Sequence, residues 1–159
     1  MAETVLRAEL AAAGLDGAVV VDSAGTGDWH VGDAMDPGAR SALASRGHDG
    51  SAHRARQFHP SWLSERDLIL AMDARNLADL RRMAQGQDLD RIRLFSEVGG
   101  LTPGGLGGVV PPGDSRARDI PDPWGGGPDE FGHVLDLLGA AAPVIAARLA
   151  RLLETVPPE

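Results

Sequence analysis

Residues Leu68 to Met72 read L-I-L-A-M, and Asp73 follows them directly. Five consecutive apolar residues between polar neighbours are typical of a strand that is buried on both faces of a parallel sheet. The aspartate after the run predicts a helix cap, and we expect the helix to run to about Gln85, before Gly86. A buried strand that leads straight into a helix is the repeating unit of an α/β fold.

The remaining pattern extends this unit through a single domain of residues 1–159. Similar apolar runs predict strands at Ala18 to Val21 and Arg91 to Phe95. Helical spacing of apolar residues predicts helices at Met1 to Leu10, from Asp36 and Pro37 to Gly47, at Pro60 to Arg66, and at Asp129 to Leu153 with a kink or break at Pro143. Residues Gly99 to Asp114, rich in Gly and Pro, are expected to form a long loop. Strands that alternate with helices indicate an α/β fold with a parallel sheet.

Composition excludes several classes of protein. The net charge is -8 and every basic residue is arginine, which argues against nucleic acid or an anionic membrane as partner. No signal peptide precedes the first helix, and no apolar run is expected to approach the length that crosses a bilayer, so a cytoplasmic protein is predicted. The chain contains no cysteine, which excludes disulfides, thiolate metal sites and a cysteine nucleophile within these residues.

One short stretch combines a rigid backbone, a carboxylate and an aromatic ring: Asp119 to Gly127, reading D-I-P-D-P-W-G-G-G. Pro121 and Pro123 fix φ at their own positions, so Asp122 sits on a stiff backbone, and Trp124 follows closely. A carboxylic acid beside a planar ring suits proton transfer to the leaving oxygen of an aromatic ester. The alternative is a surface loop with a packed tryptophan.

Three further residues each have a functional and a structural interpretation. Ser23 lies at the carboxyl end of the first predicted strand, where open α/β sheets bind ligands, or is a plain strand-end serine. Trp29 is a wall for a substrate or a cover for the core. His53 lies between charged neighbours in S-A-H-R-A-R-Q, where Arg54 and Arg56 either order a neighbouring loop or form a solvated basic segment.

Other patterns fail the tests for cofactor or metal sites. The pair Gly25-x-Gly27 lacks the third glycine of a dinucleotide loop, and no helix follows at once. The glycines of Gly99 to Gly108 cannot form a P-loop because the chain has no lysine. The spacings of His48, His53 and His59 match no helical face and no carboxylate pattern joins them. None of these patterns therefore predicts a metal or nucleotide site.

Taken together, the motifs resemble those of the low-molecular-weight protein tyrosine phosphatases, from Met1 to the last helix. The resemblance rests on M-A-E-x-x-x-R at Met1, D-S-A-G-T-G-D-W-H-V-G at Asp22, D-P at Asp36, H-R-A-R-Q at His53, L-A-M-D-x-x-N-L at Leu70, and D-I-P-D-P-W at Asp119. It implies a four-stranded parallel sheet of order 2-1-3-4 flanked by helices. It also implies hydrolysis of phosphotyrosine, in a protein or a small aryl phosphate, through a phosphocysteine intermediate without a cofactor.

The resemblance also assigns roles to individual residues. Asp122 matches the general acid, Trp29 matches one aromatic wall of the substrate cleft, and Trp124 replaces the tyrosine opposite it. The residues that would support the phosphate loop are Ser23 and His53, in a polar network, and Asp73 and Asn76, which line the site from below. Asp73 also has a complete structural explanation as a helix cap.

This sequence departs from the family at one decisive point. Family members carry a C-x5-R-S loop between the first strand and the M-A-E sequence, whereas here M-A-E begins the chain. We therefore expect residues 1–159 to be an N-terminally truncated domain that lacks the first, central strand, the cysteine nucleophile and the phosphate-binding arginine. Such a chain is expected to be inactive as given and only marginally stable. The alternatives are a non-catalytic phosphatase-like binding protein and an arsenate reductase relative, which also needs cysteine.

Overall fold

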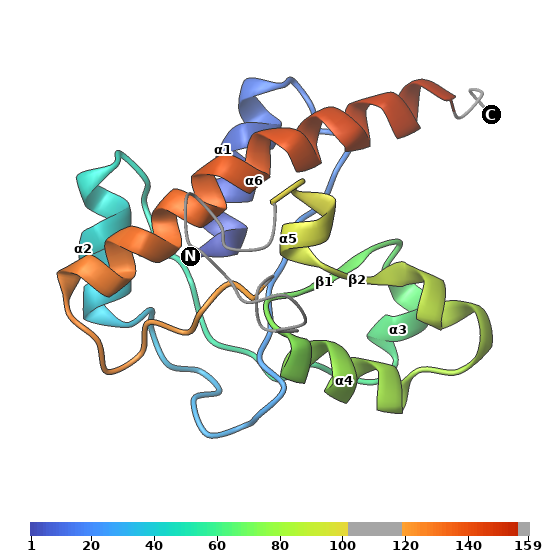
Figure 1. The fold of residues 1–159 in the computed structure, drawn as a ribbon, viewed down its shortest axis with the longest axis horizontal. Coiled ribbons are helices and arrows are strands. Elements are labelled where there is room, and N and C mark those ends of the chain that lie inside the picture. Colours follow the sequence, from blue (N-terminus) through green and yellow to red (C-terminus); the bar gives the residue numbers. More distant parts are fainter. Residues whose placement is uncertain (102–118, 156–159) are drawn as a thin grey trace, which may run out of the picture.

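Helices surround a short parallel sheet in the computed structural model, which describes residues 1–101 and 119–155 (Figure 1). The elements in chain order are α1 (Ala2–Ala12), α2 (Pro37–Ser45), α3 (Trp62–Glu65), β1 (Ile69–Ala71), α4 (Ala74–Met83), the 3₁₀ helix η1 (Gly86–Arg91), β2 (Ile92–Leu94), α5 (Phe95–Val98) and α6 (Pro128–Thr155).

The sheet consists of β1 and β2, which pair in parallel with Ile69 opposite Ile92 and Ala71 opposite Leu94. Both strands lie within the apolar runs that predicted them. Their buried side chains pack with Leu63 of α3 and others to form the smaller of two apolar clusters. The predicted α/β class, with a parallel sheet and flanking helices, is confirmed.

The larger apolar cluster lies among α1, α2, α5 and α6, which Figure 1 shows on the opposite side of the molecule from α3 and α4. Leu10 of α1, Leu43 of α2 and Phe95 of α5 are almost completely buried against α6. The buried residues of α6 are Phe131, Val134, Leu135, Leu137, Leu138, Ala141, Ala142, Ile145 and Ala146. Their spacing is that of one helical face, which explains why this helix forms the centre of the core.

Helix α6 is long and apolar enough to cross a membrane when judged by length and composition alone. The expectation that no apolar run approaches that length was therefore wrong. The prediction considered only uninterrupted apolar runs, whereas α6 is apolar on average although polar residues interrupt its sequence. Core packing accounts for that content, because its buried residues face α1, α2 and α5.

The predicted strand at Ala18 to Val21 is wrong for the described residues, since no strand is formed there. Val20 is 95% exposed, whereas Val19 and Val21 pack partly against the larger cluster. A strand of a parallel sheet requires a backbone neighbour, and the described segments provide none for these residues. The run has the composition of a strand, but no strand lies beside it among the described residues.

A kink or break was predicted at Pro143, and since helix α6 continues through this residue, the helix does not break there. Pro143 lies on the exposed face while Ala142 and Ile145 are fully buried, so core packing outweighs the lost hydrogen bond.

The short helix α5 (Phe95–Val98) was not predicted, because its first residue was assigned to the strand at Arg91 to Phe95. Most of the long loop predicted at Gly99 to Asp114 lies outside the described residues.

Candidate active site

The loop that carries Asp122 begins beside the end of β1, where its first residues are fixed. Ile120 is 4% exposed in the larger apolar cluster, and its N–H donates a hydrogen bond to the carbonyl oxygen of Met72 at 2.8 Å. Pro121 and Pro123 then restrict the backbone on either side of Asp122. The carboxylate therefore stands on a segment with little conformational freedom.

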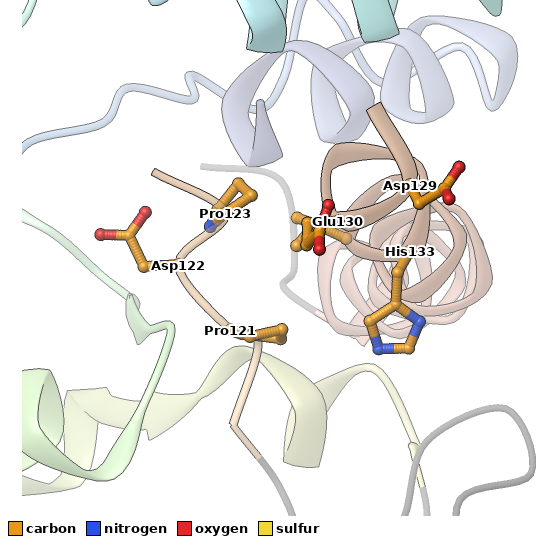
Figure 2. A pocket seen from close by; sticks show the side chains of 7 residues that line it. Pro121, Asp122, Pro123, Asp129, Glu130 and His133 are labelled. Atoms are coloured by element: carbon orange, nitrogen blue, oxygen red, sulfur yellow. The ribbon is translucent and has the colours of Figure 1, made fainter. Parts of the chain in front are cut away.

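The carboxylate of Asp122 lies at the surface and closes a local turn. Its Oδ1 atom accepts a hydrogen bond from the N–H of Trp124 at 3.0 Å. In Figure 2 it points to the side of the loop opposite Glu130 and His133. A turn follows, in which the N–H of Gly126 donates to the carbonyl oxygen of Pro123 at 2.9 Å. The carboxyl group is thus accessible to a bound molecule on one side of the loop.

The far end of the loop is fixed to α6. The N–H of Gly127 donates to Oε2 of Glu130 at 2.9 Å, in the manner of one half of a capping box. A pocket of about 410 Å³ lies here, lined by Pro121, Asp122, Pro123, Asp129, Glu130, His133 and Val134 (Figure 2). Because the Asp122 carboxylate points away from it, this pocket is not where that group would act.

Two exposed tryptophans provide flat apolar surfaces. Trp124 is 72% exposed and Trp29 is 79% exposed, so neither ring covers the core. The ring of Trp29 lies against Gly27, where a Cβ atom would come within 2.4 Å of it. Glycine at position 27 is therefore required for this placement of the ring. Exposed indole faces of this kind suit stacking against another aromatic ring.

Ser23 and His53 come together through Glu3 of α1. The hydroxyl of Ser23 donates to Oε2 of Glu3 at 2.5 Å, and Nδ1 of His53 lies 3.6 Å from the same oxygen. Arg7 pairs with the other oxygen of Glu3 at 2.9 Å and also donates through Nε to the carbonyl oxygen of Val21 at 2.9 Å. A four-residue polar network thus joins α1 to the segments that contain Ser23 and His53.

The electrostatics of this network favour neutral His53. Desolvation lowers the pKa of His53 from 6.5, and the positive charge of the N-terminal amine lowers it further. Glu3 opposes both effects. The pKa of the Met1 amine is itself lowered from 8.0 by burial, again with Glu3 opposing. Of the two interpretations of Arg56, the ordering of a neighbouring segment agrees with the structure, since Nη2 donates to the carbonyl oxygen of Ser23 at 3.1 Å.

Asp73 and Asn76 lie at the N-terminus of α4. Oδ1 of Asp73 accepts a hydrogen bond from the N–H of Asn76 at 2.6 Å, so Asp73 caps the helix as predicted. Asp119 binds the same helix end, because its Oδ1 accepts from the N–H of Ala74 at 2.9 Å. The described residues contain no group of three or more His, Asp or Glu side chains that could hold a metal ion.

Sequence reasoning did not assign Glu3, Arg7 and Asp119 as site residues. The M-A-E-x-x-x-R motif contains a signal for the first two, because Glu and Arg four residues apart on a helix form an ion pair. Asp119 has no such local signal, since its partner Ala74 is 45 residues away. Contacts of that kind require the fold.

The site therefore contains an exposed carboxylate on a stiff loop, two exposed aromatic faces and a polar network at the start of α1. Its residues provide acid–base chemistry on an aromatic compound but no thiol nucleophile, since the chain contains no cysteine.

Comparison with known proteins identifies the class. The family model of the low molecular weight phosphotyrosine protein phosphatases matches residues 1–155. A low molecular weight protein-tyrosine-phosphatase of Streptomyces coelicolor is 39% identical over 97% of this chain and 87% of its own length. A low molecular weight phosphotyrosine protein phosphatase of Schizosaccharomyces pombe is 36% identical over 83% of this chain and 76% of its own length.

Solved structures agree with this result. A protein tyrosine phosphatase from Entamoeba histolytica with Hepes in the active site superimposes with a TM-score of 0.81 at 26% identity, covering 96% of this chain and 88% of that one. YfkJ from Bacillus subtilis gives 0.78 at 29% identity, over 95% and 86% of the two chains. The chain belongs to the low molecular weight phosphotyrosine protein phosphatase family.

Proposed function

We propose that this chain supplies the general acid and the substrate-binding surfaces for phosphotyrosine hydrolysis, with Asp122 as the acid. The observation that carries the proposal is the loop geometry. The exposed carboxylate of Asp122 lies between two prolines and two residues after the buried Ile120, and it accepts a hydrogen bond from the backbone N–H of Trp124, whose ring is exposed. A phenolate that leaves phosphorus needs a proton, and a flat phenyl ring suits an indole surface.

In the proposed reaction a cysteine thiolate attacks phosphorus and the bond from phosphorus to the phenolic oxygen breaks. Asp122 gives its proton to that oxygen, so the phenol leaves neutral and a phosphocysteine remains. The Asp122 carboxylate then takes a proton from a water molecule, which attacks phosphorus and releases inorganic phosphate and the thiolate. Asp122 is protonated again at the end of the cycle.

Other residues receive supporting roles in the proposal. Trp29 and Trp124 form the walls that hold the phenyl ring. The residues that support the phosphate-binding segment are Ser23 and His53, linked through Glu3, and Asp73 and Asn76 at the start of α4. The substrate is a phosphotyrosine-containing protein or a small aryl phosphate in the cytoplasm, and neither nucleic acid nor membrane is a partner.

The nucleophile in this proposal comes from outside the 159 residues, because cysteine is absent from them. A segment of the form C-x5-R-S, as family members are expected to carry, would provide the thiolate and a bidentate arginine for the phosphate. Residues 1–159 alone are accordingly proposed to be catalytically inactive.

A fusion tests both parts of the proposal. An apolar strand followed by a C-x5-R-S segment is joined in front of Met1, and hydrolysis of p-nitrophenyl phosphate is compared with that by residues 1–159 alone. We expect turnover from the fusion and none above background from the shorter chain. Turnover by the shorter chain that Asp122→Asn abolishes would show that the nucleophile lies within residues 1–159.

The acid role is tested in the same fusion. Asp122→Asn should lower kcat by about 10²- to 10⁴-fold, the usual contribution of general acid–base catalysis. Asp129→Asn is the matched control, because Asp129 is an exposed carboxylate near the same loop but lies by the pocket from which Asp122 points away. An equal loss in the two variants would refute the role of Asp122.

A further inference from the structure

Asp119 connects the loop that carries Asp122 to the N-terminus of α4. Its Oδ1 atom accepts a hydrogen bond from the N–H of Ala74 at 2.9 Å. Ala74 is the first residue of α4, so its N–H has no acceptor within the helix. A carboxylate at this end of a helix also interacts favourably with the helix dipole. The contact thus stabilises both the helix end and the loop.

A second hydrogen bond fixes the same part of the loop. The N–H of Ile120 donates to the carbonyl oxygen of Met72 at 2.8 Å. Met72 and Ala74 lie on either side of Asp73, whose own carboxylate caps α4. Consecutive residues of the loop, Asp119 and Ile120, therefore hold both sides of the turn between β1 and α4.

The direction of the chain at this point determines where the acid lies. Asp122 follows Ile120 by two residues, and Pro121 and Pro123 restrict the backbone between and beyond them. Few torsions remain that could move the carboxylate of Asp122 independently. The hydrogen bond of Asp119 to α4 therefore also restricts where Asp122 can lie.

We propose that Asp119 is a positioning residue for the general acid. By binding the N-terminus of α4, it sets the place of Asp122 relative to Asp73, which caps this helix, and Asn76 in its first turn. The inference rests on the proposed function, in which Asp122 donates the proton. Asp119 itself touches neither the substrate nor the reacting atoms.

The test uses residues 1–159 and needs no activity. The Asp119→Ala variant is compared with the unmodified chain by amide hydrogen exchange and by ¹⁵N relaxation of Trp124, whose N–H reports the Asp122 carboxylate through their 3.0 Å hydrogen bond. We expect exchange at Trp124 to accelerate about fivefold or more, the factor that corresponds to a lost capping bond. The order parameter of the Trp124 amide should fall as well.

Asp36→Ala is the matched control. Oδ1 of Asp36 caps α2 by accepting from the N–H of Ala39 at 3.0 Å, so its loss removes the same kind of bond elsewhere. This variant should leave Trp124 unchanged. Equal acceleration at Trp124 in both variants would show a general loss of stability, and no acceleration in Asp119→Ala would also overturn the proposal.

Two conservative variants carry the test if Asp119→Ala does not fold. Asp119→Asn keeps an oxygen acceptor in place and should preserve exchange at Trp124, whereas Asp119→Glu moves the carboxylate by one methylene and should accelerate it. Equal rates in the two variants would overturn the proposal. A different result is that Asp119→Ala accelerates amide exchange at Trp124 while Asp122→Asn does not slow the fused enzyme. That result would show that Asp119 positions the loop but that Asp122 is not the general acid.

Discussion

The carboxylate of Glu3 accepts a hydrogen bond from the hydroxyl of Ser23 at 2.5 Å, and the same oxygen lies 3.6 Å from Nδ1 of His53. One residue of α1 therefore joins two polar side chains that are 30 positions apart in sequence. The side chain of Glu3 is only 16% exposed, so solvent screens its charge incompletely. A change at Glu3 should consequently be felt at His53.

Glu3→Gln should lower the pKa of His53 further. Desolvation and the N-terminal charge already lower this pKa from 6.5, and Glu3 is the group that opposes them. Removing the negative charge leaves desolvation, the N-terminal charge and the charge of Arg56 unopposed in lowering the pKa of His53. The measurement is an NMR titration of the His53 ring carbons. Asp33→Asn, beside the exposed His30, is the control and should not change His53. A rise in the His53 pKa on Glu3→Gln would contradict this view of the network.

Stability should increase with pH on the acid side of neutrality. Because the pKa of His53 is lowered in the folded state, the unfolded chain binds more protons than the folded chain as the pH falls through 6.5. The histidine contribution to the free energy of unfolding should therefore decrease as the pH falls below 6.5 and be constant above 6.5. The Met1 amine acts in the same direction below 8.0. Denaturant unfolding between pH 5 and 8 measures the effect.

His53→Gln identifies the histidine contribution to this pH dependence. Glutamine cannot titrate, so the slope of the free energy of unfolding below pH 6.5 should become shallower. His48→Gln serves as a control at another histidine outside the network. An unchanged slope in His53→Gln would show that His53 is not the group responsible.

Gly99→Ala and Gly132→Ala should have opposite effects on stability. A Cβ atom at Gly99 would lie 2.3 Å from Cβ of the fully buried Ala141, so the substitution should destabilise by about 1–3 kcal/mol. A Cβ atom at Gly132 in α6 meets nothing within 4 Å, and alanine there should stabilise by about 0.5–1 kcal/mol. Urea unfolding compares them. Two changes of the same sign would contradict the packing of α5 against α6.

The different environments of Ile92 and Val20 give a further prediction. Ile92 is 0% exposed in β2, so Ile92→Ala should cost about 2–5 kcal/mol of unfolding free energy. Val20 is 95% exposed, and Val20→Ala should change stability by no more than about 0.5 kcal/mol. The same unfolding experiment measures both. A large loss at Val20 would mean that residues 18–21 are buried in the protein in solution.

The elements that the sequence predicted well are those defined by local rules. Asp36 and Asp73 cap helices because an aspartate side chain reaches a backbone N–H three residues ahead, and this depends on spacing alone. The runs around β1 and β2 were recognised by their apolar composition, and each strand found the other as its neighbour.

The errors arise where a neighbour decides the outcome. Ala18 to Val21 has the composition of a strand, but strand formation needs a backbone partner that composition cannot reveal. Proline at position 143 removes a backbone hydrogen bond and predicted a kink or break, but the buried neighbours of Pro143 in α6 keep the helix continuous. Within the site, motifs indicated Asp122 and Ser23, whereas the contact of Asp119 with Ala74 became visible only in the folded chain.

The measurement that tests the central claim most directly is the effect of Asp122→Ala on two leaving groups in the fused enzyme. Phenyl phosphate releases a phenol with a pKa of about 10, as tyrosine does, and therefore depends on a proton donor. p-Nitrophenyl phosphate releases a more stable anion that depends on it less. If Asp122 is the general acid, kcat should fall much further for phenyl phosphate. Equal slowing of both substrates would contradict that role.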